Sequence, residues 1–571
     1  MAHYGTETKE VAWRNGLFNF ATGGLKDGIA CMLSNRACPN DIWPSASLMS
    51  KIEGAMKTIP HHACLILTLI VVAVASASAA DIYITQNATG ADSGANCANA
   101  HSATWFNANA TGGNTYHLCG TFTGTPGQNM LISPAGAAGR VLTILFETGA
   151  VMTAPQWGSN DGNFPTGGAI TVNSYVTVDG GTNGVIKNTL NGGAGTSCAG
   201  GTCTSNISAG IYVPSGTTDV EIKNLTIRDI YRCNGASTCS SFYSSGIKSS
   251  GSKTNFSVHD NTITGTSVGI YLEYSGSALN NVNIFSNTLS DQYWGINIGS
   301  GSAGNTTNNV NIYDNTMSNF DTWQNTPAHE DGIIVFSSSV ANIFNIYNNT
   351  ISAHGNLTGN VFCTYGSASP GASCNIFNNV LVVNNNTCAA IGGGRAIWLH
   401  GGSGPHAVVN NTMIGANSSC YLIELESPVT VSRFQNNIHT NENWGVEDQQ
   451  TNNIQMVDHN LYNNSSAVWN YGGYKTFAQW QALGFDPNGI SGDPSLDSNH
   501  VPQADSIAIK AATNLSSICS GQPNPGLGAL CLDKNGAPRP STGAWDTGAF
   551  QYSQGTQTQV AAPTGLRATA Q

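Results

Sequence analysis

A short phrase that recurs about every thirty residues is the feature that most restricts how this 571-residue chain can fold. Each copy is an alternating polar and apolar segment with an Asn near its end, as in "FSVHDNTI", "VNIFSNTL" and "VNIYDNTM". The repeated Asn stands at eight positions: Asn224, Asn261, Asn287, Asn315, Asn349, Asn379, Asn411 and Asn437. Successive spacings are 37, 26, 28, 34, 30, 32 and 26 residues. Such a period without any helical pattern predicts a solenoid of β-strands.

A second phrase lies between the copies of the first, as in "AGIYV", "VGIYLE", "DGIIVF" and "RAIWLH". Its residues alternate between inward apolar and outward positions, which is the period of two expected for a strand. Two or three strands per coil describe an all-β, right-handed parallel β-helix with a cap at each end. Stacked Asn side chains on successive coils, about 4.8 Å apart, can then hydrogen-bond to one another and to the turn backbone.

A secretion signal precedes the repeats. From Met56 the chain reads "MKTIPHHACLILTLIVVAVASASAAD", a Lys followed by an apolar run and small residues. We therefore expect a secreted or cell-surface protein. The expected parts are an upstream extension, a signal peptide, an N-terminal cap with the first coils, the β-helix, a C-terminal capping region and a linker or truncated module: residues 1–55, 56–80, 81–165, 166–450, 451–552 and 553–571.

Charge restricts the partners. The net charge is −12, the isoelectric point is about 5.4, and no cluster of Lys and Arg occurs. Nucleic acid is therefore excluded as a partner, because its phosphates require basic side chains. We expect a monomer that has no contact with the membrane once the signal has been removed.

Cysteines are used in neighbouring couples. Beyond the signal, twelve Cys form six of them: 97/119, 198/203, 233/239, 363/374, 388/420 and 519/531. Local disulfides in an oxidising compartment are the natural interpretation, with zinc as the alternative. Cys388 and Cys420 each stand nine residues after their repeat Asn, so they should stack on adjacent coils. A separation of about 4.8 Å suits a disulfide, and we predict that bridge.

Alignment of the strand phrases predicts two outward columns of side chains. The first is Tyr212, Lys248, Tyr271, Asn297, Ile334, Phe362, Trp398 and Glu424, and the second is Pro214, Ser250, Glu273, Gly299, Phe336, Thr364, His400 and Glu426. Aromatic rings can stack on sugars and carboxylates can accept hydroxyl hydrogen bonds, so this long face suits an extended glycan. Outward aromatics that only support loops are the alternative. The expected substrate-binding residues are Lys248, Tyr271, Trp294, Asn297, Trp398, His400 and Glu424.

A cluster of ionisable residues stands at one corner of the coils. His329, Glu330 and Asp331 directly precede a strand in a chain of which only 9% is charged, and Arg395 lies two coils away, within about 10 Å. A glycoside hydrolase needs one protonated and one ionised carboxyl. Asp331 with Glu330, or one of them with Glu273, could supply the pair, supported by His329 and Arg395. A polar turn is the alternative.

Residues 165 to 450 resemble the secreted right-handed β-helix superfamily of pectate-lyase-like proteins, which implies a polysaccharide partner. "EDGIIV" is similar to the Asn-Thr-Asp-Gly segment of polygalacturonase-type hydrolases and places Asp331 at a catalytic Asp. The paired Asp-Asp and the Gly-His-Gly of that family are absent, and its Arg-x-Lys is matched only by Arg395. Lyases with this fold use a Lys or Arg base and carboxylate-bound Ca²⁺, so the resemblance also allows a Ca²⁺-dependent lyase that uses Lys248 or Arg395.

The C-terminal part carries a further resemblance. "GDPSLDSNHVPQADSIAIKAA" and "CLDKNGAPRPSTGAWDTGAFQY" resemble the region found in bacterial exported β-helix proteins of the choice-of-anchor type, which would cap the open end of the solenoid. "AAPTGLRATAQ" resembles the first strand of a fibronectin type III module. The leading hypothesis is hydrolysis of a neutral or weakly acidic polysaccharide without a required cofactor. The alternatives are the lyase, with Ca²⁺, and a non-catalytic surface adhesin.

Overall fold

The computed structural model describes residues 79–162, 164–189, 207–230, 244–299, 304–320, 330–336, 342–353, 357–363, 371–383, 394–415, 421–448 and 452–552. All of these residues belong to one compact unit. The upstream extension, nearly all of the signal peptide and the tail after residue 552 lie outside the described residues. His329, the predicted Cys388–Cys420 bridge and the couples 198/203 and 233/239 also lie outside them.

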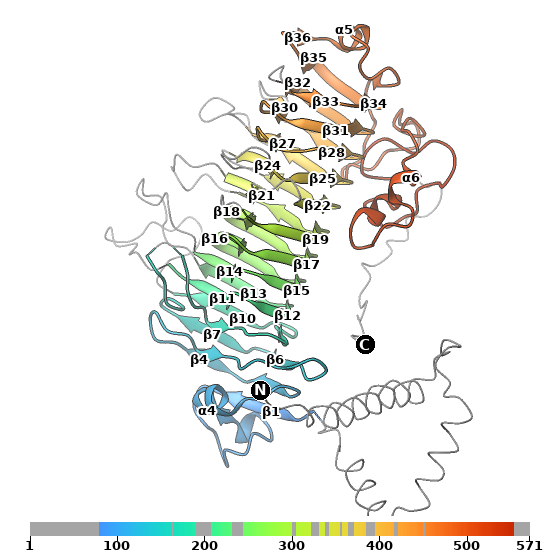
Figure 1. Cartoon of the computed structure of the whole chain (residues 1–571). Coiled ribbons are helices and arrows are strands. Elements are labelled where there is room, and N and C mark those ends of the chain that lie inside the picture. The colour runs from blue at the N-terminus through green and yellow to red at the C-terminus, as the bar shows by residue number, and fades with distance from the viewer. Residues whose placement is uncertain are drawn as a thin grey trace, which may run out of the picture. The chain divides into compact units, whose positions relative to one another are not determined.

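One long sheet forms the first side of the solenoid (Figure 1). Its fifteen strands all pair in parallel. In sheet order they are β2 (His101–Ser102), β1 (Asp81–Thr85), β3 (Thr115–Leu118), β6 (Leu142–Phe146), β9 (Val176–Asp179), β12 (Thr217–Lys223), β15 (Lys253–His259), β17 (Ala278–Phe285), β19 (Thr306–Tyr313), β22 (Ile343–Tyr347), β25 (Ser373–Phe377), β28 (His406–Val409), β31 (Thr430–Gln435), β33 (Asn453–Ile454) and, beside β31, β34 (Val457–Asp458).

A second sheet of 22 strands holds the other two strand rows of each coil. Four long strands run through both rows and join them: β16 (Thr262–Glu273), β18 (Thr288–Gly299), β32 (Ile438–Asp448) and β35 (Leu461–Asn470). The row that follows the first sheet also contains β4 (Thr121–Thr123), β7 (Val151–Ala154), β10 (Val185–Asn188), β13 (Thr226–Ile230), β20 (Thr316–Ser318), β23 (Thr350–Ala353), β26 (Val380–Val383), β29 (Thr412–Ile414) and β37 (Ile490–Ser491). The next row contains β5 (Leu131–Ile132), β8 (Ile170–Thr171), β11 (Ala209–Val213), β14 (Ser245–Ser250), β21 (Glu330–Phe336), β24 (Leu357–Cys363), β27 (Arg395–Leu399), β30 (Tyr421–Leu425) and β36 (Tyr474–Lys475).

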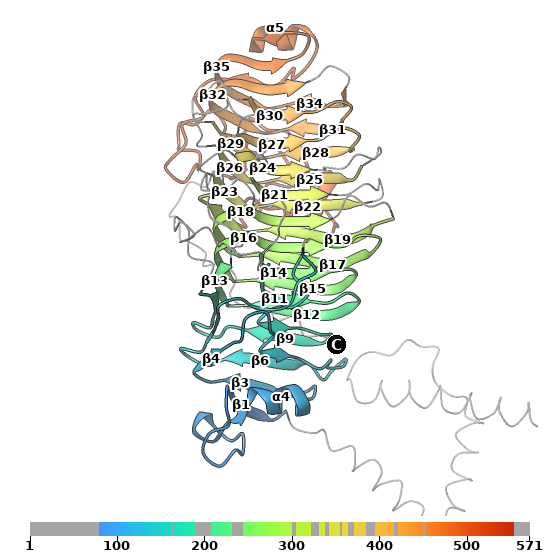
Figure 2. The ribbon, with the colours of Figure 1, turned by 90° about the vertical axis from the view of Figure 1, so that its left-hand side faces the viewer.

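Strand follows strand up the molecule in both sheets, so the fold is the predicted right-handed parallel β-helix (Figure 2). Its interior is one continuous apolar core of inward side chains such as Ile270, Ile296 and Ile333. The predicted first outward column is confirmed residue by residue, because each member pairs with the next on the following coil from Tyr212 to Glu424.

Helices close the two ends of the described solenoid (Figure 1). At the N-terminal end, α4 (Ala103–Asn109) begins at the Ser102 N-cap and packs Phe106 against Tyr116. At the other end, α5 (Phe477–Ala482) stacks Trp480 on Trp469, with ring centroids 4.4 Å apart. The other helices among the described residues are α6 (Ser516–Cys519) and two 3-10 helices, Cys97–Asn99 and Leu527–Cys531.

The buried Asn ladder is present and longer than predicted. Each Asn donates through Nδ2 to Oδ1 of the next at 3.0–3.1 Å, from Asn261 to Asn460, which in turn donates to Asp486. The assignment of Asn224 to this ladder was wrong. Because Lys223 pairs with His259, Leu225 lies opposite Asn261, and Asn224 occupies the left-handed turn position before it, with φ 59°.

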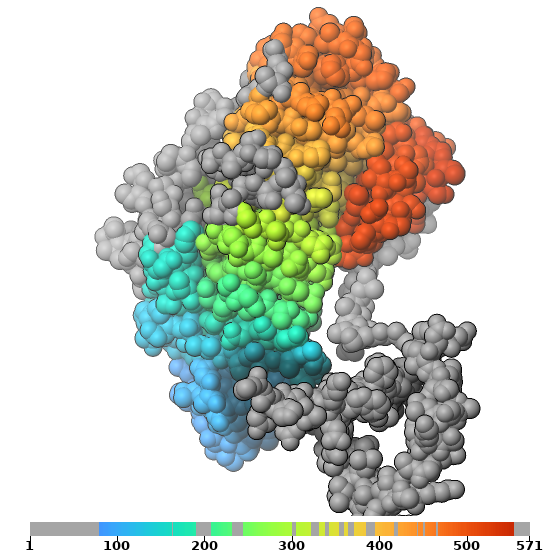
Figure 3. Space-filling view, viewed as in Figure 1, coloured from blue at the N-terminus to red at the C-terminus, as the bar shows by residue number. Residues whose placement is uncertain are grey.

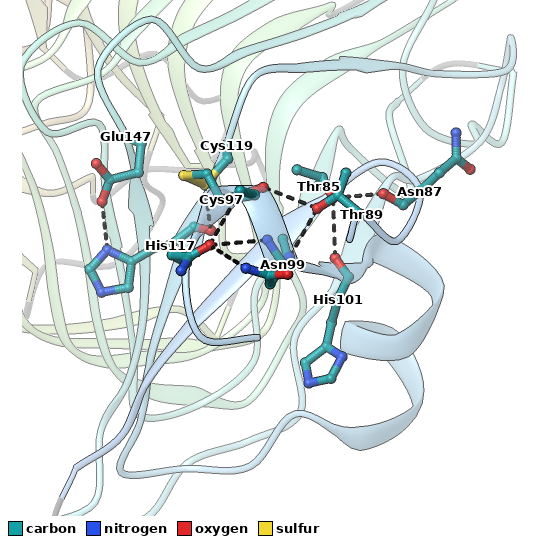
Figure 4. The surroundings of a disulfide bond; sticks show 12 residues. Thr85, Asn87, Thr89, Cys97, Asn99, His101, His117, Cys119 and Glu147 are labelled. Atoms are coloured by element: carbon teal, nitrogen blue, oxygen red, sulfur yellow. Dashed lines mark hydrogen bonds and ion pairs between the residues drawn. A yellow bond between two sulfur atoms is a disulfide. The ribbon is translucent and has the colours of Figure 1, made fainter. Parts of the chain in front are cut away.

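Three of the predicted cysteine couples form disulfides: Cys97–Cys119, Cys363–Cys374 and Cys519–Cys531. Their Cα–Cα distances of 5.7, 6.6 and 5.5 Å lie within the usual range. Figure 4 shows the first of them beside His117, whose Nδ1 lies 2.6 Å from Glu147 Oε1. The bridge joins the first 3-10 helix to the end of β3 and therefore secures the N-terminal cap.

The C-terminal region divides into two parts with different positions. The capping of the open end falls to α5, whereas residues 493–552 lie against the side of the first sheet, where Figure 3 shows them in red. There Trp545 and Leu530 cover Phe377 and Val409, and buried Arg539 donates to Oδ1 of Asn378 at 3.1 Å. We expected all of residues 451–552 to cap the end of the solenoid. Residues 493–552 instead cover the side of the first sheet.

A buried histidine in the core makes stability depend on pH. His439 takes the inward position that Met413 fills on the preceding coil, and its burial lowers its pKa from 6.5 to about 3. Below pH 6.5 His439 binds a proton in the unfolded chain but not in the folded chain. The contribution of neutral His439 to the free energy of unfolding is therefore fully present above pH 6.5 and is lost as pH falls toward 3. The full difference in the free energy of unfolding is roughly 5 kcal/mol.

In the His439→Met variant the free energy of unfolding should therefore fall less steeply as the pH is lowered. Urea unfolding between pH 7.5 and 4 measures this dependence. The variant and the wild type should change together between pH 7 and 8, which serves as the internal control. An unchanged loss of stability in acid would assign the acid sensitivity to other groups, among them His406, whose pKa burial also lowers to about 3.

Candidate functional site

The predicted catalytic corner forms one column across four coils. Trp294, Asp331, Gly359 and Arg395 pair in succession, so Asp331 and Arg395 lie two coils apart as expected. Gly359 leaves the space between them without a side chain; a Cβ there would lie 3.7 Å from Asp331 Oδ1. Asp331 is 0% exposed and Glu330 is also buried. A polysaccharide cannot touch these two carboxyls in this arrangement, and their catalytic role stays a prediction.

Glu273 is not brought to that corner. On β16 the corner column holds Val268, so Glu273 stands five residues further along, about 16 Å away in the strand direction. Its partner is buried Lys248, whose Nζ lies 2.6 Å from Glu273 Oε2 and 3.6 Å from the Tyr271 ring centroid. Burial lowers the pKa of Lys248 to about 8, and Glu273 opposes that shift.

The outward aromatic residues of the middle coils are packed rather than open. Tyr271, Trp294 and Phe362 are buried in a cluster on the outer face of the strands, and Asn297 beside them is buried as well. In the alternative interpretation, the outward aromatic residues only support loops. Their burial agrees with that interpretation. Trp398 differs because it stacks on Phe362 at 4.3 Å and keeps part of its surface exposed.

The first outward column continues past the predicted residues into a group of carboxylates. Trp398, Glu424, Glu447 and Asn470 occupy it on consecutive coils. Glu426 lies two residues from Glu424 on the same coil. We call Glu424, Glu426 and Glu447 the glutamate cluster. Glu447 was not among the residues predicted from the sequence, although "NWGVED" repeats the pattern of "YWGINIG" and marks one further coil.

Glu424 is the most enclosed member of the glutamate cluster, with 8% of its surface exposed. Its Oε2 contacts Nη2 of Arg395, whose guanidinium carbon also lies 4.9 Å from the Trp398 ring centroid. Burial raises the pKa of Glu424 above its ordinary value, and the charges of Glu426 and Glu447 raise it further, while Arg395 opposes the shift. The predicted residues Arg395, Trp398 and Glu424 are thus brought together.

Glu447 lies in a different environment. It is half-buried, it accepts a hydrogen bond from Asn470 Nδ2 at 2.8 Å, and it accepts a second from the Tyr421 hydroxyl. The Tyr421 hydroxyl also lies 2.8 Å from that of Tyr474. Two donors directed at one carboxylate fix its orientation and satisfy its oxygen atoms. Glu424 and Glu447 are therefore neighbouring carboxyls with unlike surroundings.

Glu426 connects the cluster to His400 of the second predicted column. It accepts from Trp398 Nε1 at 3.2 Å and lies 3.4 Å from His400 Nε2. Both side chains remain partly exposed. The predicted residue His400 thus belongs to the same site as Trp398 and Glu424.

One group in the described part of the chain has donor atoms close enough to share a metal ion: Cys363, Cys374 and His406. The two sulfurs are joined in a disulfide, and His406 Nδ1 accepts from the Cys374 backbone N–H at 3.0 Å. These atoms therefore serve the core. No helix among the described residues is long and apolar enough to cross a membrane.

The fold and site define a parallel β-helix protein with an aromatic and acidic face. No family model matches the chain, and no curated protein matches it. Similar solved structures include pectate lyase Pel9A (13% identity, 84% of this chain and 97% of that one, TM-score 0.41) and the GH136 lacto-N-biosidase from Eubacterium ramulus (12%, 72% and 67%, 0.41). A mannuronic acid specific family 6 polysaccharide lyase from human gut microbiota is also similar (11%, 68% and 83%, 0.36). These neighbours are carbohydrate-active.

Proposed function

We propose that this chain is a secreted protein that binds an extended neutral or weakly acidic polysaccharide and hydrolyses it with Glu424 and Glu447. The observation that carries the proposal is that two carboxyls stand one coil apart in the same outward column, in unlike environments. A pair of carboxyls whose environments differ in this way is what glycoside hydrolysis requires.

The surroundings assign the two roles. Glu447, which accepts from Asn470 and Tyr421, is the base or nucleophile. Glu424, whose pKa burial raises, is the acid that protonates the leaving oxygen. The acid must be protonated to act, so activity is retained below the raised pKa of Glu424 and falls as pH rises through it.

Trp398 would bind a sugar ring beside the two carboxyls. Its ring is partly exposed and is fixed by Phe362, Arg395 and the bond from Nε1 to Glu426. Trp398→Ala should raise KM about tenfold, because an aromatic contact of about 1.4 kcal/mol is lost, with a smaller change in kcat. The matched control is Trp105→Ala in the N-terminal cap, half-buried against His101, which should leave KM unchanged. Equal KM values for both variants would remove Trp398 from the site.

The deciding experiment incubates residues 81–571 with a panel of plant and microbial polysaccharides and follows reducing ends and ultraviolet absorbance. New reducing ends without unsaturated products, lost in Glu447→Gln, would support hydrolysis at the glutamate cluster. Glycan binding without any product, retained in Glu447→Gln and Asp331→Asn, would instead support the non-catalytic adhesin.

A second candidate, the Ca²⁺-dependent lyase, is favoured by Lys248. A lysine whose pKa is lowered to about 8 can act as a base near neutral pH. The lyase predicts products that absorb in the ultraviolet, loss of activity with a chelator, and its abolition in Lys248→Met. Products without unsaturation would exclude it.

A further inference from the structure

A sharp chain reversal follows directly after the proposed site. After β35 the sequence "YGGY" turns the chain back, with Gly472 and Gly473 at φ 61° and 107°. Glycine adopts these positive φ values without a steric penalty, which explains the tight turn. The returning strand β36 pairs antiparallel with β35, unlike the parallel coils before it, and places Tyr474 opposite Asn470.

The outward column therefore ends just beyond Glu447. After Glu447 it contains Asn470 on β35 and Tyr474 on β36, and this antiparallel pair is the last in that row of the described sheet. The column thus extends only two strand spacings, about 10 Å, beyond Glu447. On the other side of Glu447 the column continues through Glu424 and Trp398 over many coils.

Tyr474 folds back over this last stretch of surface. Its ring stacks on Trp444, which belongs to the coil of Glu447, with centroids 5.1 Å apart and planes at 18°. Its hydroxyl lies 2.8 Å from the hydroxyl of Tyr421, one coil earlier still. The side chain thus reaches across two coils and remains 51% exposed. The Tyr474 backbone thus stands at the end of the column, and its ring leans toward Trp444 and Tyr421, which precede Glu447 and Glu424 by three residues on their strands.

We infer, on the basis of the proposed function, that Tyr474 closes the end of the glycan-binding face and that the protein acts on chain ends, releasing short products of one length. The polysaccharide would lie along the column from Trp398, with its terminal units held between Glu447 and Tyr474. A mid-chain segment would have to run past Tyr474, whereas a chain end stops against it.

The test uses the full mature chain and the polysaccharide that it hydrolyses, with an end-labelled oligosaccharide of the same sugar. Wild type should release from the first minutes one short product, about ten times more abundant than any other length, the ratio that about 1.4 kcal/mol of preference produces. Solution viscosity should fall slowly. Tyr474→Ala should release a range of lengths and lower the viscosity faster. Tyr474→Phe keeps the ring and should retain the single product.

Different outcomes overturn different claims. A range of products from wild type, or an unchanged pattern in Tyr474→Ala, overturns the chain-end inference and leaves hydrolysis standing. Absence of cleavage of every glycan, or cleavage that Glu447→Gln does not reduce, overturns the proposed function and this inference with it. Because Tyr474 is half-exposed at a hairpin, its variants should fold, which thermal unfolding would check.

Discussion

Replacement of Glu447 by Gln is expected to lower kcat for polysaccharide hydrolysis by about 10²- to 10⁴-fold, the usual contribution of a positioned acid or base. Gln has the shape of Glu and keeps an oxygen for the hydrogen bonds from Asn470 and Tyr421, so the fold should be unchanged. The variant lacks the carboxylate that attacks the sugar or activates a water molecule beside it. The measurement is reducing ends released per enzyme, at saturating substrate.

Matched variants separate catalysis from electrostatics. Glu221→Gln removes a partly exposed carboxylate from the first sheet, where it lies beside Lys223 and His259, and should leave kcat unchanged. Asp331→Asn tests the corner that the sequence pattern selects. If Asp331→Asn abolished hydrolysis while Glu447→Gln retained it, the catalytic pair would lie at the corner and not in the glutamate cluster.

Asn349→Ala is expected to lower the free energy of unfolding by about 3 kcal/mol, since several buried polar groups lose their partners together. Asn349 Nδ2 donates to the carbonyls of Ile312 and Tyr347 and to Asn379 Oδ1, each at 3.0 Å. Its Oδ1 accepts from both the backbone and the side chain of Asn315. Alanine removes these side-chain bonds at a site without access to water and keeps only the bond from the backbone N–H of residue 349 to Asn379 Oδ1. Urea unfolding measures the loss.

A second Asn on the same strand and turn provides the control. Asn345 also belongs to a ladder, accepting from Asn375 Nδ2 and donating to Asn311 Oδ1 at 2.9 Å, but it is only half-buried on the outer face. Water can replace its partners, so Asn345→Ala should cost less than about 1 kcal/mol. Equal losses for the two variants would show that burial of the Asn349 ladder is not what stabilises the coils.

Much of the architecture is predictable because it repeats. The same short pattern on every coil specifies the strand rows and the register of the outward column, and the closeness of the cysteines in the sequence predicts Cys97–Cys119, Cys363–Cys374 and Cys519–Cys531. The error at Asn224 shows the limit of this reasoning. In "KNLTI" an Asn stands one place before the ladder position, and only the pairing of Lys223 with His259 shows that Leu225 occupies it.

The sequence by itself determined the solenoid, since alternation of period two and stacking of like residues are local properties that each coil expresses independently. It also determined that Trp398 and Glu424 are neighbours in one outward column and that Arg395 lies at the corner before it. The tertiary structure decided which outward residues are reachable, because burial depends on segments far apart in the chain: Asp331 and Tyr271 are enclosed, whereas Trp398 and Glu447 keep exposed surface. It also decided that Tyr474 folds back to Tyr421, a contact across 53 residues that no repeat pattern encodes.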